Sequence, residues 1–428
     1  MRASRSWVRQ VAFGLVTTPL AANVTSAQTP VVQSRVAEQP APAEQPAPAA
    51  DAKKSNKASR PNAGWRVSPS FRVDAEYDNN VFLLAPNKKD NVATPSGADV
   101  TSGRYADMKN ASDVLTTMAA GLTVKGPGLM GKPSLIVTDV SYELYAQNTE
   151  RSNVGLGLSI QQQTWAGGRL RLQGRLTPSY FARNYLTDAL DQDASGSITD
   201  NERVYTHGEY RESQLGADYR LLIVKSRRKH PFGAAVQLGG GYYSRSYYTP
   251  LTGRDLQGPV GSAKLLLDLG RRVGLDLSYD YSSLGASRSN QVLILDEVDF
   301  GQDFNANGTA TDLDARVATV VDRSRNEHSL GATLRFEPSK PMELILGYEH
   351  RWRRYTSGEA LDVANRGRED ARHQLSGDLR FRVTKDLRLR VGGVHSSQNL
   401  NRSGDPGSAG EIDDYTRSQA RLGLSYEL

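Results

Sequence analysis

The chain has 428 residues, with 53 Lys and Arg against 47 Asp and Glu, which gives a formal net charge of +6 at pH 7. It contains no cysteine, which excludes disulfide bonds, thiolate metal sites and cysteine nucleophiles. The mean hydropathy is low, and no apolar run after the N-terminus is long enough for a spanning helix. A transmembrane β-barrel is still compatible with this composition, because only every second residue of its strands faces lipid.

The N-terminal residues have the features of a secretory signal peptide. Three arginines lie within the first nine residues, Val11–Leu20 is a short apolar segment, and small residues precede Gln28. This order predicts a signal peptide over residues 1–27. In residues 28–63 the sequence AEQPAP occurs twice in tandem and bulky apolar residues are almost absent, which predicts a disordered Pro/Ala-rich linker.

From residue 64 onward, apolar and polar residues alternate. In the segment WRVSPSFRVDAEY (65–77), one face carries Trp, Val, Pro, Phe, Ala and Tyr, and the other carries Arg, Ser, Asp and Glu. A long strand with one apolar and one charged face fits lipid outside and water inside. Strands of soluble sandwiches are usually shorter, about 5–6 residues, so a soluble sandwich or propeller is the less favoured alternative.

The same alternation recurs in thirteen further segments, which makes fourteen predicted strands. Short turns alternate with long polar loops between them, and an even strand count with alternating short and long connections is typical of single-chain bacterial barrels. The sequence therefore predicts an all-β fold, a transmembrane antiparallel up-and-down β-barrel over residues 64–428. The further strands are 114–124, 135–145, 154–165, 169–183, 205–223, 234–247, 260–269, 273–283, 321–337, 342–355, 371–383, 387–397 and 415–428. The long loops, expected to be extracellular, are 78–112, 146–153, 184–204, 248–259, 284–320, 356–370 and 398–414.

Two short segments carry a resemblance to a known family. AEYDNNVF (Ala75–Phe82) is similar to the Y-D-x-N-V-F segment that follows the first strand of porin-like barrels and of the barrels of surface lipoprotein assembly modifiers. ARLGLSYEL (Ala420–Leu428) alternates to the last residue, as do the terminal strands of Gram-negative outer-membrane barrels, although those usually end in phenylalanine. The chain thus resembles the outer-membrane β-barrel porin-like family.

This resemblance implies a location in the bacterial outer membrane, contact with its lipid and lipopolysaccharide, and insertion by the barrel-assembly machinery. Assembly modifiers usually carry helical repeats before the barrel, whereas this chain has the Pro/Ala linker there, which argues against their specific activity. Nothing in the sequence indicates a nucleic-acid partner.

Alternation assigns many charged residues to the inward face, with arginine in excess. An arginine-rich channel of low dielectric would favour anions, which predicts a passive porin for small, preferably anionic solutes. The alternative is that inward charges pair across neighbouring strands and fill the barrel, as in a surface scaffold or an export or assembly barrel for glycan or lipoprotein. The predicted pore-lining residues are Arg72, Arg171, Arg175, Arg335, Arg351, Arg353, Arg380, Arg382 and Arg390.

Two long loops contain segments with the spacing of a calcium-binding loop, DQDASGSITDNE (191–202) and DFNANGTATDLD (303–314). Both place oxygen-bearing residues at alternate positions, a glycine sixth and a carboxylate twelfth, which is the ligand pattern that Ca²⁺ requires. We expect structural calcium to brace both loops, more weakly at the second, where the last carboxylate is the shorter Asp. The alternative is a pair of Asp/Asn/Gly-rich turns. The predicted ligands are Asp191, Asp193, Ser195, Ser197, Glu202, Asp303, Asn305, Asn307, Thr309 and Asp314.

Most histidines lie near the predicted extracellular ends of strands and face outward. Together with Trp352 and several tyrosines they are expected to form an interfacial girdle. His395 and Ser397 share one face and could form a base and a nucleophile, an arrangement similar to that of outer-membrane phospholipase A. The surrounding residues do not match that enzyme and no orienting partner is identifiable, so the chain is expected not to be an enzyme and a hydrolase is a minor alternative. The outward histidines are His207, His328, His350, His373 and His395.

Overall fold

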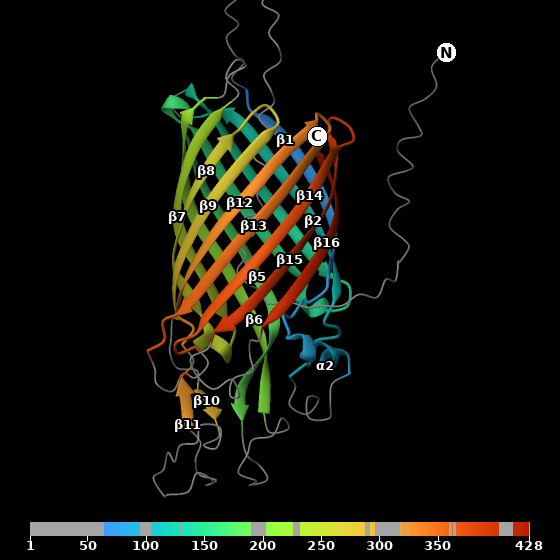
Figure 1. Ribbon diagram of the computed structural model, residues 1–428, viewed down its shortest axis with the longest axis vertical. Helices are drawn as coiled ribbons and strands as arrows, with labels where there is room; N and C mark the ends of the chain where they lie inside the picture. Colours follow the sequence, from blue (N-terminus) through green and yellow to red (C-terminus); the bar gives the residue numbers. More distant parts are fainter. Residues whose placement is uncertain are drawn as a thin grey trace, which may run out of the picture.

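Fourteen strands of the described residues form one closed antiparallel barrel in the computed structural model (Figure 1). Each strand pairs with its neighbours along the chain, and β1 closes the barrel against β16. The strands are β1 (Arg66–Asp78), β2 (Asp113–Pro127), β3 (Pro133–Tyr145), β4 (Asn153–Gln163), β5 (Arg169–Ala189), β6 (Arg203–Val224), β7 (Gly233–Tyr247), β8 (Leu256–Asp268), β9 (Val273–Ala286), β12 (Arg325–Ser339), β13 (Met342–Tyr355), β14 (Glu369–Arg382), β15 (Leu387–Asn401) and β16 (Tyr415–Glu427). The predicted fold class and strand number are confirmed.

The structure describes residues 64–94, 104–128, 131–189, 203–225, 232–286, 292–295, 317–320, 322–358, 362, 365–401 and 414–427. Within this part of the chain, no helix has the length and apolar character needed to cross a membrane. The predicted signal peptide, the linker and both calcium loops lie outside the described residues.

The two faces of the wall differ as the alternation predicts. Apolar side chains are exposed on the outward face around the barrel, for example Leu215 at 67%, Leu238 at 58% and Leu375 at 57%. Exposed apolar surface of this extent marks contact with lipid or with another protein. The opposite face carries the charged residues, many of them buried.

Several strand boundaries differ from the sequence prediction, among them the start of β8 at Leu256 rather than at residue 260 and the end of β15 at Asn401 rather than at residue 397. β5 and β6 extend beyond the predicted segments at the long-loop end, and β12 begins at Arg325 rather than at residue 321. Two short strands, β10 (Val292–Leu295) and β11 (Val317–Val320), pair as a separate antiparallel sheet within the segment predicted as the loop 284–320. Their β-branched residues favour strand conformation, but four residues are too few to carry a readable alternation.

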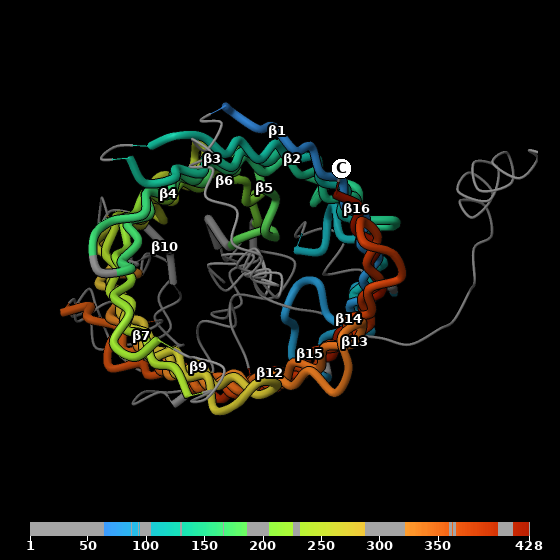
Figure 2. The backbone as a smooth tube through the Cα atoms, turned by 90° about the horizontal axis from the view of Figure 1, so that it is seen from above, coloured from blue at the N-terminus to red at the C-terminus, as the bar shows by residue number. Residues whose placement is uncertain are grey.

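The connection between β1 and β2 enters the barrel, where the sequence predicted only a long polar loop. Its first half contains η1 (Pro86–Lys88) and α2 (Lys89–Ala93). Figure 2 shows this segment, in blue, inside the outline of the wall. In Figure 1, α2 and the β10–β11 sheet lie at the same end of the barrel, opposite the C-terminus. We call the described part of residues 79–112 the inserted segment.

The outward face can be tested with a neighbouring pair of substitutions on β12. Leu334 faces outward opposite Leu346 and Leu275, whereas Thr333 faces inward between Gly347 and Asp276. In lipid vesicles we expect Leu334→Arg to lower the free energy of unfolding by about 2–4 kcal/mol, because it places a guanidinium in hydrocarbon.

Thr333→Arg is the matched control, since it places the same guanidinium on the polar inward face, between Gly347 and Asp276. Its effect should stay within about 0.5 kcal/mol. Both values come from equilibrium unfolding in urea. Equal losses for the two variants would contradict a lipid-facing outward surface.

Candidate functional site: the barrel interior and its long-loop end

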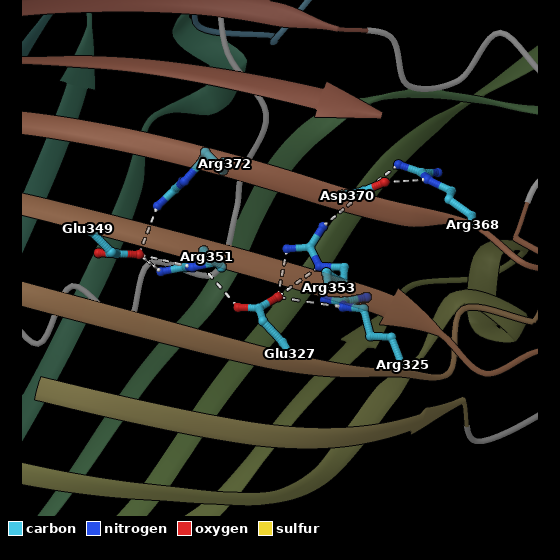
Figure 3. Close-up of polar contacts among 8 residues, drawn as sticks. All are labelled: Arg325, Glu327, Glu349, Arg351, Arg353, Arg368, Asp370 and Arg372. Atoms are coloured by element: carbon cyan, nitrogen blue, oxygen red, sulfur yellow. Dashed lines mark hydrogen bonds and ion pairs between the residues drawn. The ribbon is translucent and has the colours of Figure 1, made fainter. Parts of the chain in front are cut away.

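A network of charged side chains covers the inward face of β12, β13 and β14 near the long-loop end (Figure 3). Glu327 lies at its centre, 3.2 Å from Arg351, 2.7 Å from Arg353 and 3.9 Å from Arg325. The three strands place these residues side by side because Glu327 and Arg353 are direct cross-strand partners, as are Ser329 and Arg351. One carboxylate is thus shared by three arginines.

Two further carboxylates extend this network. Glu349 contacts Arg351 at 2.7 Å and Arg372 at 3.3 Å. Asp370 contacts Arg353 at 3.4 Å and Arg368 at 2.7 Å. Five arginines therefore share three carboxylates, which leaves two positive charges in excess within this set. We call these eight residues the arginine network, and all five of its arginines are buried or nearly so.

The nine predicted pore-lining arginines share the inward face but do not gather at one place. Arg351 and Arg353 belong to the arginine network, and Arg175 and Arg382 lie on β5 and β14 opposite Gln214 and Arg388. Because most of the nine pair with acids, cross-strand pairing and an arginine excess occur together, and the pore-lining role stays a prediction. The pairs outside the network are Arg72–Asp74 at 2.8 Å, Arg171–Asp218 at 2.6 Å, Arg335–Asp276 at 2.8 Å, Arg380–Glu343 at 3.3 Å and Arg390–Asp378 at 2.6 Å.

Part of the network was missing from the predicted site. Arg325, Glu327 and Arg372 lie within predicted strands and share the parity of Arg351, so the alternation itself could have identified them. Asp370 precedes the predicted start of its strand. Arg368 comes from the loop before β14, and no periodicity marks it.

The motif YDNNVF turns the chain from the end of β1 into the barrel. Asp78 pairs with Arg417 on β16 at 2.8 Å and accepts a hydrogen bond from the backbone amide of Asn80. The Asn80 side chain donates to the carbonyls of Leu84 and Thr416 and accepts from the amide of Leu84. These bonds satisfy the polar groups of a tight turn that is buried, as such groups require.

The inserted segment packs an apolar core against the inner wall. Val81, Phe82 and Leu84 are buried and form one cluster with Leu115 of β2 and Tyr145 of β3. Phe82 also meets Phe181 of β5 edge-on, with 6.4 Å between ring centroids. Burying apolar side chains of this size contributes roughly 1.5–3 kcal/mol each, so the segment is a packed part of the barrel.

Arg151 fixes this core to the wall. It belongs to η3 (Thr149–Arg151), is fully buried, and lies over the rings of Phe82, Tyr145 and Tyr180 at 4.9, 5.4 and 5.0 Å. Its guanidinium donates to the Ala182 carbonyl and to the Tyr180 hydroxyl. Burial acts to lower the pKa of Arg151, and the neighbouring tyrosines raise it above its usual value, so the side chain stays charged.

The return end of the inserted segment is tied to the β3–β4 connection. Asn148 accepts hydrogen bonds from the amides of Lys109 and Asn110. Asp113 in turn accepts from the Asn148 amide at 2.7 Å and from its side chain at 2.8 Å. Both ends of the segment are therefore held by side chains that satisfy backbone groups.

A tyrosine cluster covers part of the inward face of β6 and β7. Glu212 accepts hydrogen bonds from Tyr243 and Arg245, each at 2.8 Å, and Arg245 lies 4.2 Å from the ring centre of Tyr210. Tyr247 packs against Tyr210 at 5.2 Å. The sequence analysis did not identify this cluster, because alternating tyrosines on a barrel strand also fit the outward girdle.

Neither the calcium prediction nor the hydrolase alternative gains a site from the described residues. Within them, no group of three or more His, Asp or Glu side chains is placed to hold a metal ion, and the predicted calcium ligands lie outside them. His395 Nδ1 lies 2.9 Å from the Ser418 hydroxyl. Ser397 is the cross-strand partner of His373 instead.

Comparison with known proteins gives weak structural similarities. No protein-family model and no curated protein matches the chain. The outer-membrane channel DcaP of Acinetobacter baumannii aligns over 86% of this chain and 98% of its own, with 12% identity and a TM-score of 0.37. An anion-selective porin from Comamonas acidovorans aligns over 85% and 99%, with 10% identity and a TM-score of 0.34. OprD of Pseudomonas aeruginosa aligns over 85% and 93%, with 12% identity and a TM-score of 0.34. TM-scores below 0.5 do not by themselves assign a family or a function.

Arg151→Met tests whether this side chain holds the inserted segment. Methionine keeps much of the apolar volume but loses the charge and both hydrogen bonds, which we expect to cost about 2–4 kcal/mol of local stability. Limited proteolysis of the folded barrel should then cut between residues 79 and 112 at least tenfold faster, with the rest of the barrel still resistant.

The matched control is Arg354→Met, which removes an exposed arginine from the outward face. It should leave proteolysis of the inserted segment unchanged. Cleavage at the parental rate in Arg151→Met would mean that the apolar core alone holds the segment.

Proposed function

We propose that the chain is an outer-membrane β-barrel of a Gram-negative bacterium that acts as a passive porin for small, preferably anionic solutes. The wall has the two faces that this role needs, apolar outside and charged inside. The observation that carries the anion preference is the arginine network, where five arginines share three carboxylates. A buried excess of positive charge acts over a longer range than an exposed one, because water screens it less.

The inserted segment narrows the long-loop end, which is the extracellular end of the proposed porin. It occupies part of the cross-section with a packed apolar core, so solutes pass beside it, along the wall that carries the arginine network. Arg72 and Arg335 are predicted lining residues that a solute can reach, with side chains 38% and 41% exposed, and Arg175 and Arg382 are exposed as well. The porin is therefore asymmetric, with one apolar and one cationic side at its mouth.

The surroundings of the barrel follow from its proposed place. Outer-membrane lipid and lipopolysaccharide contact the outward face, the signal peptide directs export, and the barrel-assembly machinery inserts the chain. Calcium braces the loops that contain residues 191–202 and 303–314. Diffusion requires no catalytic group. His395, the base of the hydrolase alternative, contacts the Ser418 hydroxyl, and this contact does not activate Ser397, the nucleophile of that alternative.

A second candidate is a surface scaffold or an export or assembly barrel without free pore activity. The observation that favours it is the inserted segment, because a core tied down by Arg151, Asn80 and Asn148 is a stable way to fill a barrel. In that case the inward ion pairs would serve stability alone.

Planar-bilayer recording of the full chain distinguishes the two candidates. We expect ion-conducting steps and a reversal potential in a KCl gradient that favours chloride. Arg72→Gln combined with Arg335→Gln removes two accessible cations and leaves Asp74 and Asp276 unneutralised, so the chloride-to-potassium permeability ratio should fall at least twofold.

The control is Arg354→Gln combined with Arg211→Gln, which removes the same charge from exposed, outward positions and should leave the ratio unchanged. A barrel that inserts but gives no conductance steps would sink the porin proposal and favour the scaffold.

The calcium proposal has its own test. Adding a chelator should speed proteolytic cleavage between residues 184 and 204 severalfold and leave the strands intact, because the cation would brace a loop and not the wall. Glu202→Gln removes the expected bidentate ligand and should make cleavage fast with or without chelator. Equal slow cleavage in both conditions for the parental chain would contradict calcium bracing.

A further inference from the structure

Four flat rings stack in a row on the outward face of β12, β13 and β14. His328 and Trp352 stack at 5.1 Å with an interplanar angle of 9°, Trp352 and His350 at 5.4 Å and 26°, and His350 and His373 at 4.5 Å and 29°. The register explains the row, since His328 is the cross-strand partner of Trp352 and His350 is that of His373. We call these four residues the histidine–tryptophan row.

Tyrosine hydroxyls hold both ends of the row. Tyr279 lies 2.8 Å from Nδ1 of His328, and Tyr348 lies 2.9 Å from Nδ1 of His373. Each bond engages Nδ1 of an end ring, so an external ligand would meet Nε2. The rings are half-buried or exposed on the outward face, and two polar contacts fix their orientation before any ligand arrives.

The row lies at the edge of the outward apolar band that is nearer the long-loop end. On β13, the exposed Leu346 and Tyr348 lie on the short-turn side of the row, and Arg354 lies on its long-loop side. From Met342 to Trp352 the strand advances by ten residue steps and rises about 25 Å, given about 3.3 Å per residue and a strand tilt of roughly 40°. That equals the height of the apolar band of a membrane barrel, so the row lies where hydrocarbon gives way to lipid headgroups.

The row is confined to one side of the barrel. His207 of β6, predicted to face outward, stacks instead on Phe181 of the inserted segment's apolar cluster and contacts Asp107 of the inserted segment at 3.2 Å. An evenly spread girdle would need only isolated amphipathic rings, whereas three imidazoles within one stack concentrate titratable groups at one place. This confinement indicates a binding surface in addition to a general interfacial role.

The groups that face the row determine its response to protons. They include Tyr279, Tyr281 and Tyr348, with Asn326 bonded to Tyr281, and the pair Arg354–Glu369 at 3.5 Å on the aqueous side. On β15, Ser397 lies opposite His373, and His395 is the next outward residue along the strand. An imidazolium beside Trp352 gains a cation–π interaction. Imidazole is the side chain that ordinarily changes charge between pH 5 and 8.

Two adjacent imidazolium rings would repel each other. His350 and His373 stack at 4.5 Å, a distance at which two like charges in a partly desolvated place oppose each other strongly. An anion bound across their Nε2 edges offsets this repulsion, and Arg354, four residues further along β13, adds a permanent positive charge on the aqueous side. Proton uptake and anion binding are therefore coupled, and each increases the affinity for the other.

We propose that the histidine–tryptophan row, together with Arg354, docks the phosphate groups of outer-leaflet glycolipid, and that docking strengthens as the pH falls. The inference rests on the proposed outer-membrane location. A phosphate group at the headgroup level matches the row in charge and in height, and the acyl chains of the same lipid lie against the exposed leucines below. Glu369 competes with the phosphate for Arg354 and limits binding at neutral pH.

The test measures binding of diphosphoryl lipid A to the full chain in phosphatidylcholine nanodiscs. Native mass spectrometry at graded lipid A content gives an apparent affinity at pH 7.5 and at pH 5.5. We expect the affinity to rise about tenfold on acidification, and to stay low at both pH values when dephosphorylated lipid A replaces the phosphorylated lipid.

His350→Gln combined with His373→Gln should abolish the pH dependence while keeping two planar polar side chains in the row. His328→Gln alone should reduce the pH dependence of binding. His207→Gln is the matched control and should leave the pH dependence unchanged. Retarded gel mobility of the unheated barrel checks that each variant folds.

Several results would overturn the proposal: pH-independent binding, equal binding of the dephosphorylated lipid, or a double variant that keeps the pH response. Dimer formation on acidification without lipid A would assign the row to a second copy of the chain instead. Because conductance is a separate measurement, a sealed barrel that binds lipid A in this way refutes only the porin proposal.

Discussion

Closure of β1 against β16 fixes the direction in which the side chains of the wall point. The two strands pair in register from Ser70 opposite Glu427 to Asp78 opposite Gln419, and each further strand takes its register from its neighbour. Because side chains alternate with a period of two, a slip by one residue would exchange the inward and outward faces of a strand. The ion pairs inside and the apolar surface outside are thus two consequences of one hydrogen-bonded ring.

The inward face then has to satisfy many buried charges. Burying an arginine is costly unless carboxylates and hydrogen bonds compensate it, and the arginine network does so by sharing Glu327 among three guanidinium groups. Arg151 uses a second solution, with aromatic rings and a carbonyl in place of a carboxylate. At these two places in the described part of the barrel, arginines outnumber the carboxylates that contact them, although most predicted lining arginines are paired.

Alternation was sufficient to predict the fold, because each of the fourteen strands carries that local signal. The inserted segment was not predictable in this way. Asn80 bonds to the carbonyl of Thr416, 336 residues away in the sequence, and Phe82 is covered by Arg151 of the β3–β4 connection and by Phe181 of β5. Asp78 and Asn80 were noticed through a family resemblance, and the structure supplies the physical reason for the motif. The calcium loops lie outside the described residues, and the lining role of the arginines depends on solute passage, which no side-chain contact establishes.

The sequence EHRWRR (349–354) on β13 combines these constraints in six residues. Glu349, Arg351 and Arg353 point inward into the arginine network, while His350 and Trp352 point outward into the histidine–tryptophan row, with Arg354 above them. The two surfaces are separated only by the thickness of one strand. A substitution at one position therefore changes the charges of one surface directly. It can affect the other surface only by shifting the backbone of the strand. In the proposed porin, solute selectivity and lipid docking therefore depend on different side chains of the same strand, provided that its register with β12 and β14 is kept.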